Sequence, residues 1–200
     1  SFHRAEMLPL GDWRNAMRER QEALWTDVNW HLLAAERGGR LVGACSGSYL
    51  GNHNVGVIGY IAVTKSVRSS GLGPRMRNAL RRRFEADARF AGHDRLRAIV
   101  GEVREDNSWL KHLVRREGAI ALDFPYFQPS LGGDKGVVPL VMYYQPLDRA
   151  MKSLSTARLR RLLYSMWRRA YRVARPLNDP AFRQMLRALR GRRRIGSRVI

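Results

Sequence analysis

The stretch Arg68-Ser69-Ser70-Gly71-Leu72-Gly73 decides how this chain folds. It follows an apolar run at residues 57–63 and precedes a run with helical periodicity that extends from Pro74 to about residue 91. A strand, a glycine-bearing turn and a helix start predict an anion site, because the first N–H groups of a helix have no intrahelical partner and the helix dipole is positive there. The glycines allow close backbone approach to phosphate, and the arginine adds a full charge. We therefore expect a cofactor that carries a pyrophosphate.

Two common nucleotide motifs are excluded by the spacing. The chain has no Gly-x-x-x-x-Gly-Lys-Ser/Thr sequence, which a P-loop requires. The third glycine of the dinucleotide fingerprint is also absent, together with its acidic ribose-binding residue. Since two glycines near a helix start also occur for purely conformational reasons, the elements around them carry the interpretation.

Those elements resemble a known family. The order Ile61-Ala62-Val63, then the Arg-x-x-Gly-x-Gly turn, then a basic helix is similar to the acyl-CoA-binding motif of the GNAT superfamily of N-acetyltransferases. Downstream, a strand-like run at 96–103, Asn107, a short helix ended by Gly118 and a strand-like run at 119–124 resemble the family's second cofactor segment. The resemblance covers residues 1–147.

The resemblance implies an α/β fold with a mixed, largely antiparallel sheet flanked by helices. It also implies an enzyme that transfers an acetyl group from acetyl-CoA, its cosubstrate, to a primary amine that the sequence does not identify. Main-chain groups of the strand end would meet the cofactor's amide arm and thioester, and the turn would hold the pyrophosphate. The residues implied to bind acetyl-CoA are Ile61, Ala62, Val63, Arg68, Ser69, Ser70, Gly71, Leu72, Gly73 and Asn107.

The catalytic residues of the family match less well. The position where many relatives place a tyrosine acid holds Val114, and the position where some place a glutamate base holds Gly59. We expect Glu102 to be the base, because a carboxylate on a strand could face the cleft. It could equally be an exposed or salt-bridged surface residue, and a water chain could replace it. The candidates for the acid, all of which could instead be packing residues, are Tyr60, Tyr126, Tyr143 and Tyr144; Tyr126 is our choice among them.

Other chemistries receive no support. The five histidines lack metal-ligand spacing with Cys, Asp or Glu, so we expect no metal. Cys45 lies in a strand of small residues without an assignable histidine and is predicted to be a buried structural thiol. A single cysteine and no visible signal peptide favour a reducing, cytoplasmic location, although the chain begins with Ser1 and an initial segment could be missing.

Hydrophobic periodicity predicts the remaining elements. We expect helices at residues 4–25, 75–90 and 107–117, and strands at 30–35, 41–50, 55–63, 95–103, 119–124 and 137–145. The stretch 125–135 is predicted to be a long loop that could line the acceptor pocket or be a plain connection. The GNAT fold begins with a strand, whereas only three residues precede the first predicted helix here, so that strand is either lost or lacking.

Residues 148–200 form a separate, basic helical extension in this interpretation. Residues 149–200 hold 16 of the 37 Lys and Arg residues and one acidic residue, Asp179. Apolar stripes predict two helices, the first stopped by Pro176 and the second capped by Asp179. These stripes could pack on the core or on a second subunit in a homodimer, or the extension could contact nucleic acid or an anionic membrane. A catalytically inactive CoA-binding or nucleic-acid-binding adaptor is the alternative function.

Overall fold

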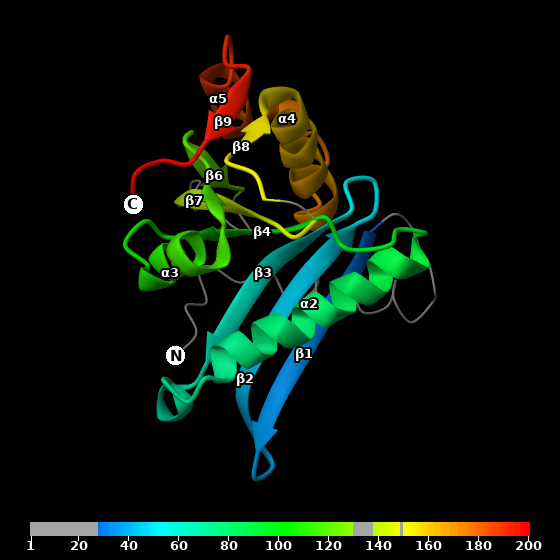
Figure 1. Cartoon of the computed structure of the whole chain (residues 1–200), viewed down its shortest axis with the longest axis vertical. Coiled ribbons are helices and arrows are strands. Elements are labelled where there is room, and N and C mark those ends of the chain that lie inside the picture. The colour runs from blue at the N-terminus through cyan, green and yellow to red at the C-terminus, as the bar shows by residue number, and fades with distance from the viewer. Residues whose placement is uncertain (1–27, 130–137, 149) are drawn as a thin grey trace. The chain divides into compact units, whose positions relative to one another are not determined.

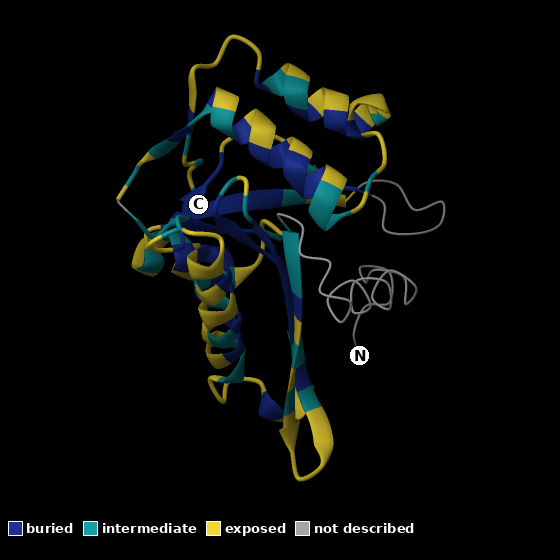
Figure 2. Ribbon diagram, turned by 90° about the vertical axis from the view of Figure 1, so that its right-hand side faces the viewer, coloured by how far each residue is buried: buried dark blue, intermediate teal, exposed yellow. Residues whose placement is uncertain are grey.

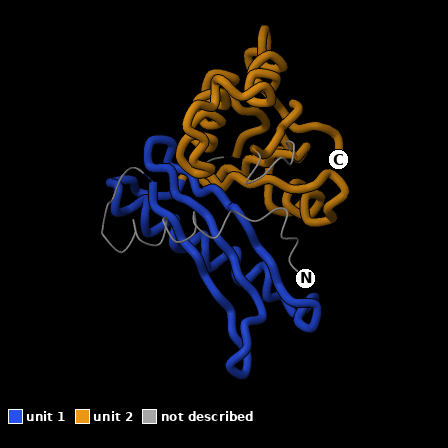
Figure 3. Tube along the Cα trace, turned by 180° about the vertical axis from the view of Figure 1, so that it is seen from behind, with its two compact units in different colours: residues 1–96 blue, residues 97–200 orange. Residues whose placement is uncertain are grey.

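The computed structural model describes residues 28–129, 138–148 and 150–200. The predicted helix over 4–25 and the part of the predicted loop beyond residue 129 lie outside these ranges. The chain forms two compact units, Ser1–Leu96 and Arg97–Ile200 (Figure 3). Residues 148–200 therefore belong to the same compact unit as residues 97–147, while their separate functional assignment stays a prediction.

Unit 1 contains an antiparallel sheet of three consecutive strands, as predicted. The strands are β1 (Val28–Arg37), β2 (Arg40–Leu50) and β3 (Val55–Val63). Gly38 and Gly39 turn the chain between β1 and β2 with φ of 55° and 71°, values that a glycine adopts without steric cost. Asn54 closes the second turn and donates from Nδ2 to the Arg95 carbonyl at 2.9 Å, which ties this turn to the end of the unit.

Helix α2 (Leu72–Phe90) covers one face of this sheet (Figure 1). Its inner face repeats every four residues and consists of Met76, Leu80, Phe84 and Ala88, all buried. A Cβ on Gly56 would lie only 2.1 Å from Phe84 Cδ2, so the strand needs glycine where the aromatic ring presses on it. Full burial of a side chain of this size contributes roughly 1.5–3 kcal/mol. The helix begins two residues earlier than its predicted start at Pro74.

Unit 2 is also built on antiparallel pairs. Strand β7 (Val138–Pro146) pairs with three others, namely β4 (Ala98–Val103), β5 (Ile120–Ala121) and β6 (Tyr126–Gln128). Helix α3 (Ser108–Glu117) has Asn107 as its N-cap and ends at Gly118, whose φ of 68° closes the helix. The predicted largely antiparallel architecture flanked by helices is thus confirmed.

Two predicted boundaries in unit 2 are wrong. The strand predicted over 119–124 is reduced to Ile120–Ala121. The stretch predicted as a loop from 125 contains strand β6, because its aromatic residues suit a half-buried strand and alternate inward, with Tyr126 and Gln128 buried. The flanking prolines and glycines had indicated a loop.

The C-terminal segment, residues 150–200, folds within unit 2. Its elements are β8 (Ser153–Ser155), α4 (Thr156–Ser165), the π-helical turn η3 (Met166–Ala170), the 3-10 turn η4 (Pro176–Asn178), α5 (Pro180–Ala188) and β9 (Arg194–Gly196). The first predicted helix ends before Pro176, because its last turn widens and Arg172 adopts a left-handed φ of 57°. The cap of the second helix is confirmed, since Asp179 Oδ1 accepts from Ala181 N at 2.8 Å.

The apolar stripes of these helices are buried inside unit 2, as the alternation of buried and exposed residues along α4 and α5 shows (Figure 2). The side chains of Trp167 and Phe182 are fully buried, with ring centroids 5.0 Å apart. The strand pair β8–β9 and a bridge between Leu122 and Ser197 join the end of the chain to the rest of the unit. None of the helices in the described ranges combines the length and apolarity needed to cross a membrane.

Candidate functional site

The predicted anion site has the expected backbone in unit 1. After the 3-10 turn η2 (Lys65–Val67), Ser69 and Gly71 take left-handed φ values of 66° and 76°, and Gly71 is the N-cap of α2. Ser70 bonds back to the Val67 carbonyl through both its N–H (3.3 Å) and its Oγ (2.7 Å), which closes the turn. Neither a capping side chain nor an acidic residue occupies the first turn of α2. The positive end of the dipole is therefore not neutralised by the turn itself.

Gly73 distinguishes this turn from a merely conformational one. Its φ is not left-handed, and a Cβ built on it would meet no described atom within 4 Å beyond its chain neighbours and its own helix backbone. Neither backbone strain nor packing within the described residues thus requires glycine here. The lack of a Cβ in the first turn lets a phosphate group approach the main-chain N–H groups closely, so the residues present fit the predicted ligand. Arg68 is exposed beside it.

The strand leading into the turn is irregular. Ile61, Ala62 and Val63 continue the antiparallel pairing of β3 with β2, opposite residues 43–45. Tyr60 pairs with Ser46 while Ile58 pairs with Gly47, so Gly59 is an extra, bulged residue. Bulges increase the local twist and are frequent next to binding sites. The predicted cofactor segment of β3 begins at Ile61, two residues after the bulged Gly59.

In unit 2 the structure brings together the two residues predicted for catalysis. Glu102 lies near the end of β4, and its Oε1 accepts a hydrogen bond from the Tyr126 hydroxyl on β6. The same oxygen accepts from the Tyr171 hydroxyl at 2.6 Å. The residue as a whole is half-buried, but Oε2 is shielded from water and has no hydrogen-bond partner among the described residues.

The surroundings change the acidity of these groups. Burial raises the pKa of Glu102 from 4.5 to about 7, and the hydrogen bonds from the two tyrosines oppose that rise only in part. Burial also raises the pKa of Tyr126 well above its usual range, helped by the neighbouring carboxylate and opposed by the indole of Trp167. At neutral pH the carboxyl group can thus exchange a proton, whereas Tyr126 keeps its own.

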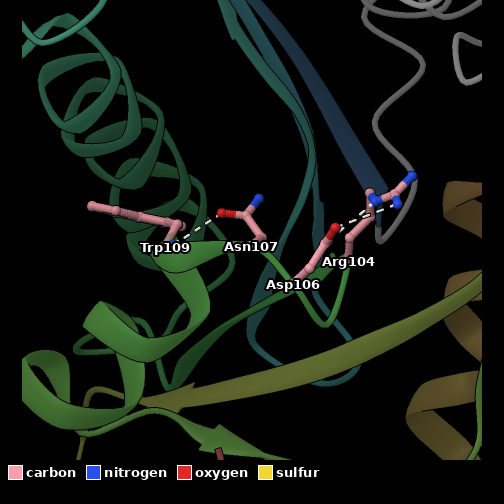
Figure 4. Close-up of polar contacts among 4 residues, drawn as sticks. All are labelled: Arg104, Asp106, Asn107 and Trp109. Atoms are coloured by element: carbon pink, nitrogen blue, oxygen red, sulfur yellow. Dashed lines mark hydrogen bonds and ion pairs between the residues drawn. The ribbon is translucent and has the colours of Figure 1, made fainter.

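Asn107 opens helix α3, as the sequence predicts. Its Oδ1 accepts from Trp109 N at 2.9 Å and caps α3, while Arg104 and Asp106 pair with each other just before it (Figure 4). The side chain is exposed. The cap uses one lone pair of this oxygen and does not involve the amide N–H₂ group, and a contact of Asn107 with a cofactor stays a prediction.

The other candidates lie in packing positions. Tyr143 and Tyr144 are buried on β7, and the Tyr143 ring packs so closely on Gly101 that a Cβ there would lie 2.4 Å from its hydroxyl. Tyr60 is half-buried on β3. Cys45 is 1% exposed, its Sγ lies 3.7 Å from the Met76 carbonyl oxygen, and burial raises the pKa of its thiol to about 11. The prediction of a buried thiol is confirmed.

Sequence reasoning missed Tyr171 as a site residue. Tyr171 falls on the apolar stripe of the first predicted C-terminal helix, and 69 residues separate it from Glu102. No local pattern signals such a contact.

Within residues 28–129, 138–148 and 150–200, no three His, Cys, Asp or Glu side chains gather as a metal ion would require.

Comparisons with known proteins bear on this arrangement. Residues 2–118 match the model of the Acetyltransferase (GNAT) family. The fold is similar to that of an acetyltransferase from the GNAT family of Bacteroides thetaiotaomicron, with a TM-score of 0.58, 17% identity and 86% of each chain covered. A ribosomal-protein-alanine N-acetyltransferase from Brucella melitensis aligns with a TM-score of 0.48 and 16% identity, over 70% of this chain and 80% of that one. Among curated proteins, no sequence matches this chain.

Proposed function

The chain belongs to the GNAT acetyltransferase family, and we propose that it transfers an acetyl group from acetyl-CoA to a primary amine. The family model matches more than half of the chain and includes β1–β3, α2 and α3. The observation that carries the proposal is the turn at residues 68–73, in which the helix start has no capping side chain and Gly73 is required neither by backbone strain nor by packing within the described residues.

Each group of candidate residues, taken within its own unit, has a task in this proposal. Main-chain N–H groups at the start of α2, with Arg68, would hold the diphosphate of acetyl-CoA, and main-chain groups of residues 61–63 would hold its amide arm. Acetyl-CoA, when bound, supplies the activated thioester. Glu102 would accept the proton that the attacking amine loses, a role suited to a carboxyl group whose pKa is about 7. Tyr126 stays protonated at neutral pH and is the candidate acid that would protonate the leaving thiolate.

The cofactor assignment is tested with Gly73→Asp. A carboxylate in front of the helix start would repel the diphosphate, so the affinity for acetyl-CoA in calorimetric titration should fall by at least about tenfold. An acidic residue in the first turn complements the helix dipole and does not weaken the fold. The matched control is Ala86→Asp, which adds the same charge at an exposed position of the same helix, roughly 20 Å along it. Normal binding by Gly73→Asp would show that the diphosphate lies elsewhere.

Turnover distinguishes an enzyme from an inactive CoA-binding protein. We expect acetyl-CoA to release free thiol in the presence of the right amine, and a panel of small amines and peptides with free N-termini or lysines would identify the acceptor class. Binding of acetyl-CoA without thiol release on any member of the panel would favour the adaptor function.

The arginines of the C-terminal segment suggest a second partner. The buried stripes leave no apolar face for a bilayer interface, and Trp167 is too buried to stack on a base. Charge remains exposed on both helices, at Arg160, Arg161, Arg183 and Arg187. We propose contact with the phosphate backbone of double-stranded nucleic acid. The affinity of the protein for duplex DNA, measured by mobility-shift titration, should fall at least tenfold between about 50 and 200 mM salt. DNA binding that does not change with salt, or binding to anionic vesicles alone, would contradict this proposal.

A further inference from the structure

We propose that Tyr171 is a positioning residue for the Glu102 carboxylate, so that the Arg-rich C-terminal segment forms part of the proton-accepting site rather than an appendage to it. This inference rests on the proposed role of Glu102 as the base. Its starting observation is the 2.6 Å hydrogen bond that the Tyr171 hydroxyl donates to Glu102 Oε1.

The backbone around Tyr171 is unusual in a way that aims the side chain. Helix α4 widens into the π-helical turn η3, in which the Tyr171 N–H bonds to the Met166 carbonyl at 2.9 Å, five residues back. The next residue, Arg172, has a left-handed φ of 57°, a conformation that disfavours a residue with a long side chain. π-turns and strained residues cluster at functional sites, because surrounding contacts must hold them in place. Here both flank Tyr171, which donates the hydrogen bond to the carboxylate.

The two carboxylate oxygens of Glu102 have different surroundings. Tyr126 and Tyr171 both donate to Oε1, while Oε2 is shielded from water without a partner among the described residues. Two donors from different elements hold Oε1 from two directions, which restrains the carboxylate more than one donor alone would. Oε2 is then the oxygen with lone pairs available for a proton. An orphaned buried oxygen carries an energetic penalty, so its retention is more readily explained by chemistry than by stability.

The groups around Glu102 make its titration a sensitive probe. Among the described residues, the titratable side chains that face it are Tyr126 from β6 and Tyr171 after η3, and both hydrogen bonds favour the charged form. Across β4 and β7, its partner in register is Met142, which carries no charge. Removal of one donor should therefore raise the pKa of Glu102, whereas loss of packing alone would admit water and lower it.

The test is Tyr171→Phe, which removes only the hydroxyl. We expect the acid limb of the pH profile of kcat/KM to move to higher pH by about one unit, with the KM for acetyl-CoA unchanged. The matched control is Tyr164→Phe, which removes a hydroxyl from an exposed tyrosine of the same segment and should leave the profile in place. An unmoved acid limb in Tyr171→Phe would overturn the proposal.

A second measurement does not depend on activity. The Glu102 side-chain carboxyl can be titrated by NMR in the full chain with 13C-labelled glutamate, its signal assigned with Glu102→Gln. Tyr171→Phe should raise this pKa, and 3-fluorotyrosine at position 171, a stronger donor of the same shape, should lower it. Shifts of opposite sign support the positioning role even if the acceptor amine is never found. Two shifts of the same sign, or none, would overturn it, and neither result depends on whether Glu102 is the base.

Discussion

Two carboxylates removed from bulk water, Asp87 in unit 1 and Glu102 in unit 2, have opposite surroundings. Both oxygens of Asp87 have partners: Asn29 Nδ2 donates to Oδ1 at 2.8 Å, and His31 Nε2 lies 2.5 Å from Oδ2. Both donors of Glu102 instead converge on Oε1, and both are uncharged phenols. Its Oε2 has no partner among the described residues.

This difference in hydrogen bonding indicates that Asp87 has a structural role and that Glu102 can take part in proton transfer. A buried carboxylate with a donor on each oxygen is held in a single geometry, and here it joins α2 to β1. A carboxylate that loses water without gaining a full set of donors resists ionisation, which is why the pKa of Glu102 reaches about 7. A group of this kind can exchange protons at neutral pH.

Of the substitutions considered, Glu102→Gln should have the largest effect, and the effect should be on catalysis. The amide keeps the shape and the Oε1 acceptor but cannot take a proton, so kcat/KM should fall by about 100- to 10,000-fold, the usual contribution of general base catalysis. Thiol release from acetyl-CoA with the identified amine measures it. Acetyl-CoA affinity should not change, because the diphosphate turn lies on other elements. An active Glu102→Gln enzyme would leave a water chain as the base.

Stability gives the same variant an independent readout with a definite sign. The folded-state pKa of about 7 lies above the unfolded value of 4.5, so the folded protein binds the extra proton between these values. The contribution of this bound proton to the free energy of unfolding is fully present below about pH 4.5 and is lost as pH rises to 7. Wild type should therefore lose on the order of 3 kcal/mol of unfolding free energy relative to Glu102→Gln over this window, and nothing more above it. Urea titrations at pH 4.5, 7 and 8 measure it; a constant difference would mean that Glu102 is well solvated.

Much of the fold was predictable because its signals are local. The three strands of unit 1 and helix α2 follow from alternation, turn residues and a four-residue apolar repeat, all visible within short windows. The strand pair β8–β9 was missed because its partners, Ser153–Ser155 and Arg194–Gly196, are 40 residues apart and short. Strand β6 was missed because prolines and glycines near it outweighed its aromatic residues.

The candidate site was predictable only as separate pieces. A glycine turn before a helix predicts an anion site, and the turn has the backbone this requires. Glu102 and Tyr126 were chosen individually from residue type and strand position, and their hydrogen bond was not foreseen. Tyr171 could not be chosen, because its neighbours in sequence indicate only an amphipathic helix. Its contact depends on the widened turn of η3, which no short pattern encodes.

Asp87→Asn tests the structural role of the other carboxylate and should have a smaller effect, on stability rather than on turnover. The amide replaces one acceptor oxygen with a donor, so His31 or Asn29 loses its bond, or the His31 ring must change tautomer to accept from the amide. Loss of a hydrogen bond in a buried site costs roughly 1–3 kcal/mol, which urea unfolding would measure. Turnover per folded molecule should not change.

The matched control is Glu85→Gln on the same helix, which removes a partly exposed pair with Arg81 at 2.8 Å. Exposed pairs of this kind contribute about 0.3–0.5 kcal/mol, so the two substitutions should differ several-fold although each removes one acidic charge from α2. If Asp87→Asn instead lowered turnover and left stability intact, a full set of hydrogen bonds would no longer mark a structural carboxylate in this protein. The case for Glu102 as the proton acceptor would then lose the contrast on which it depends.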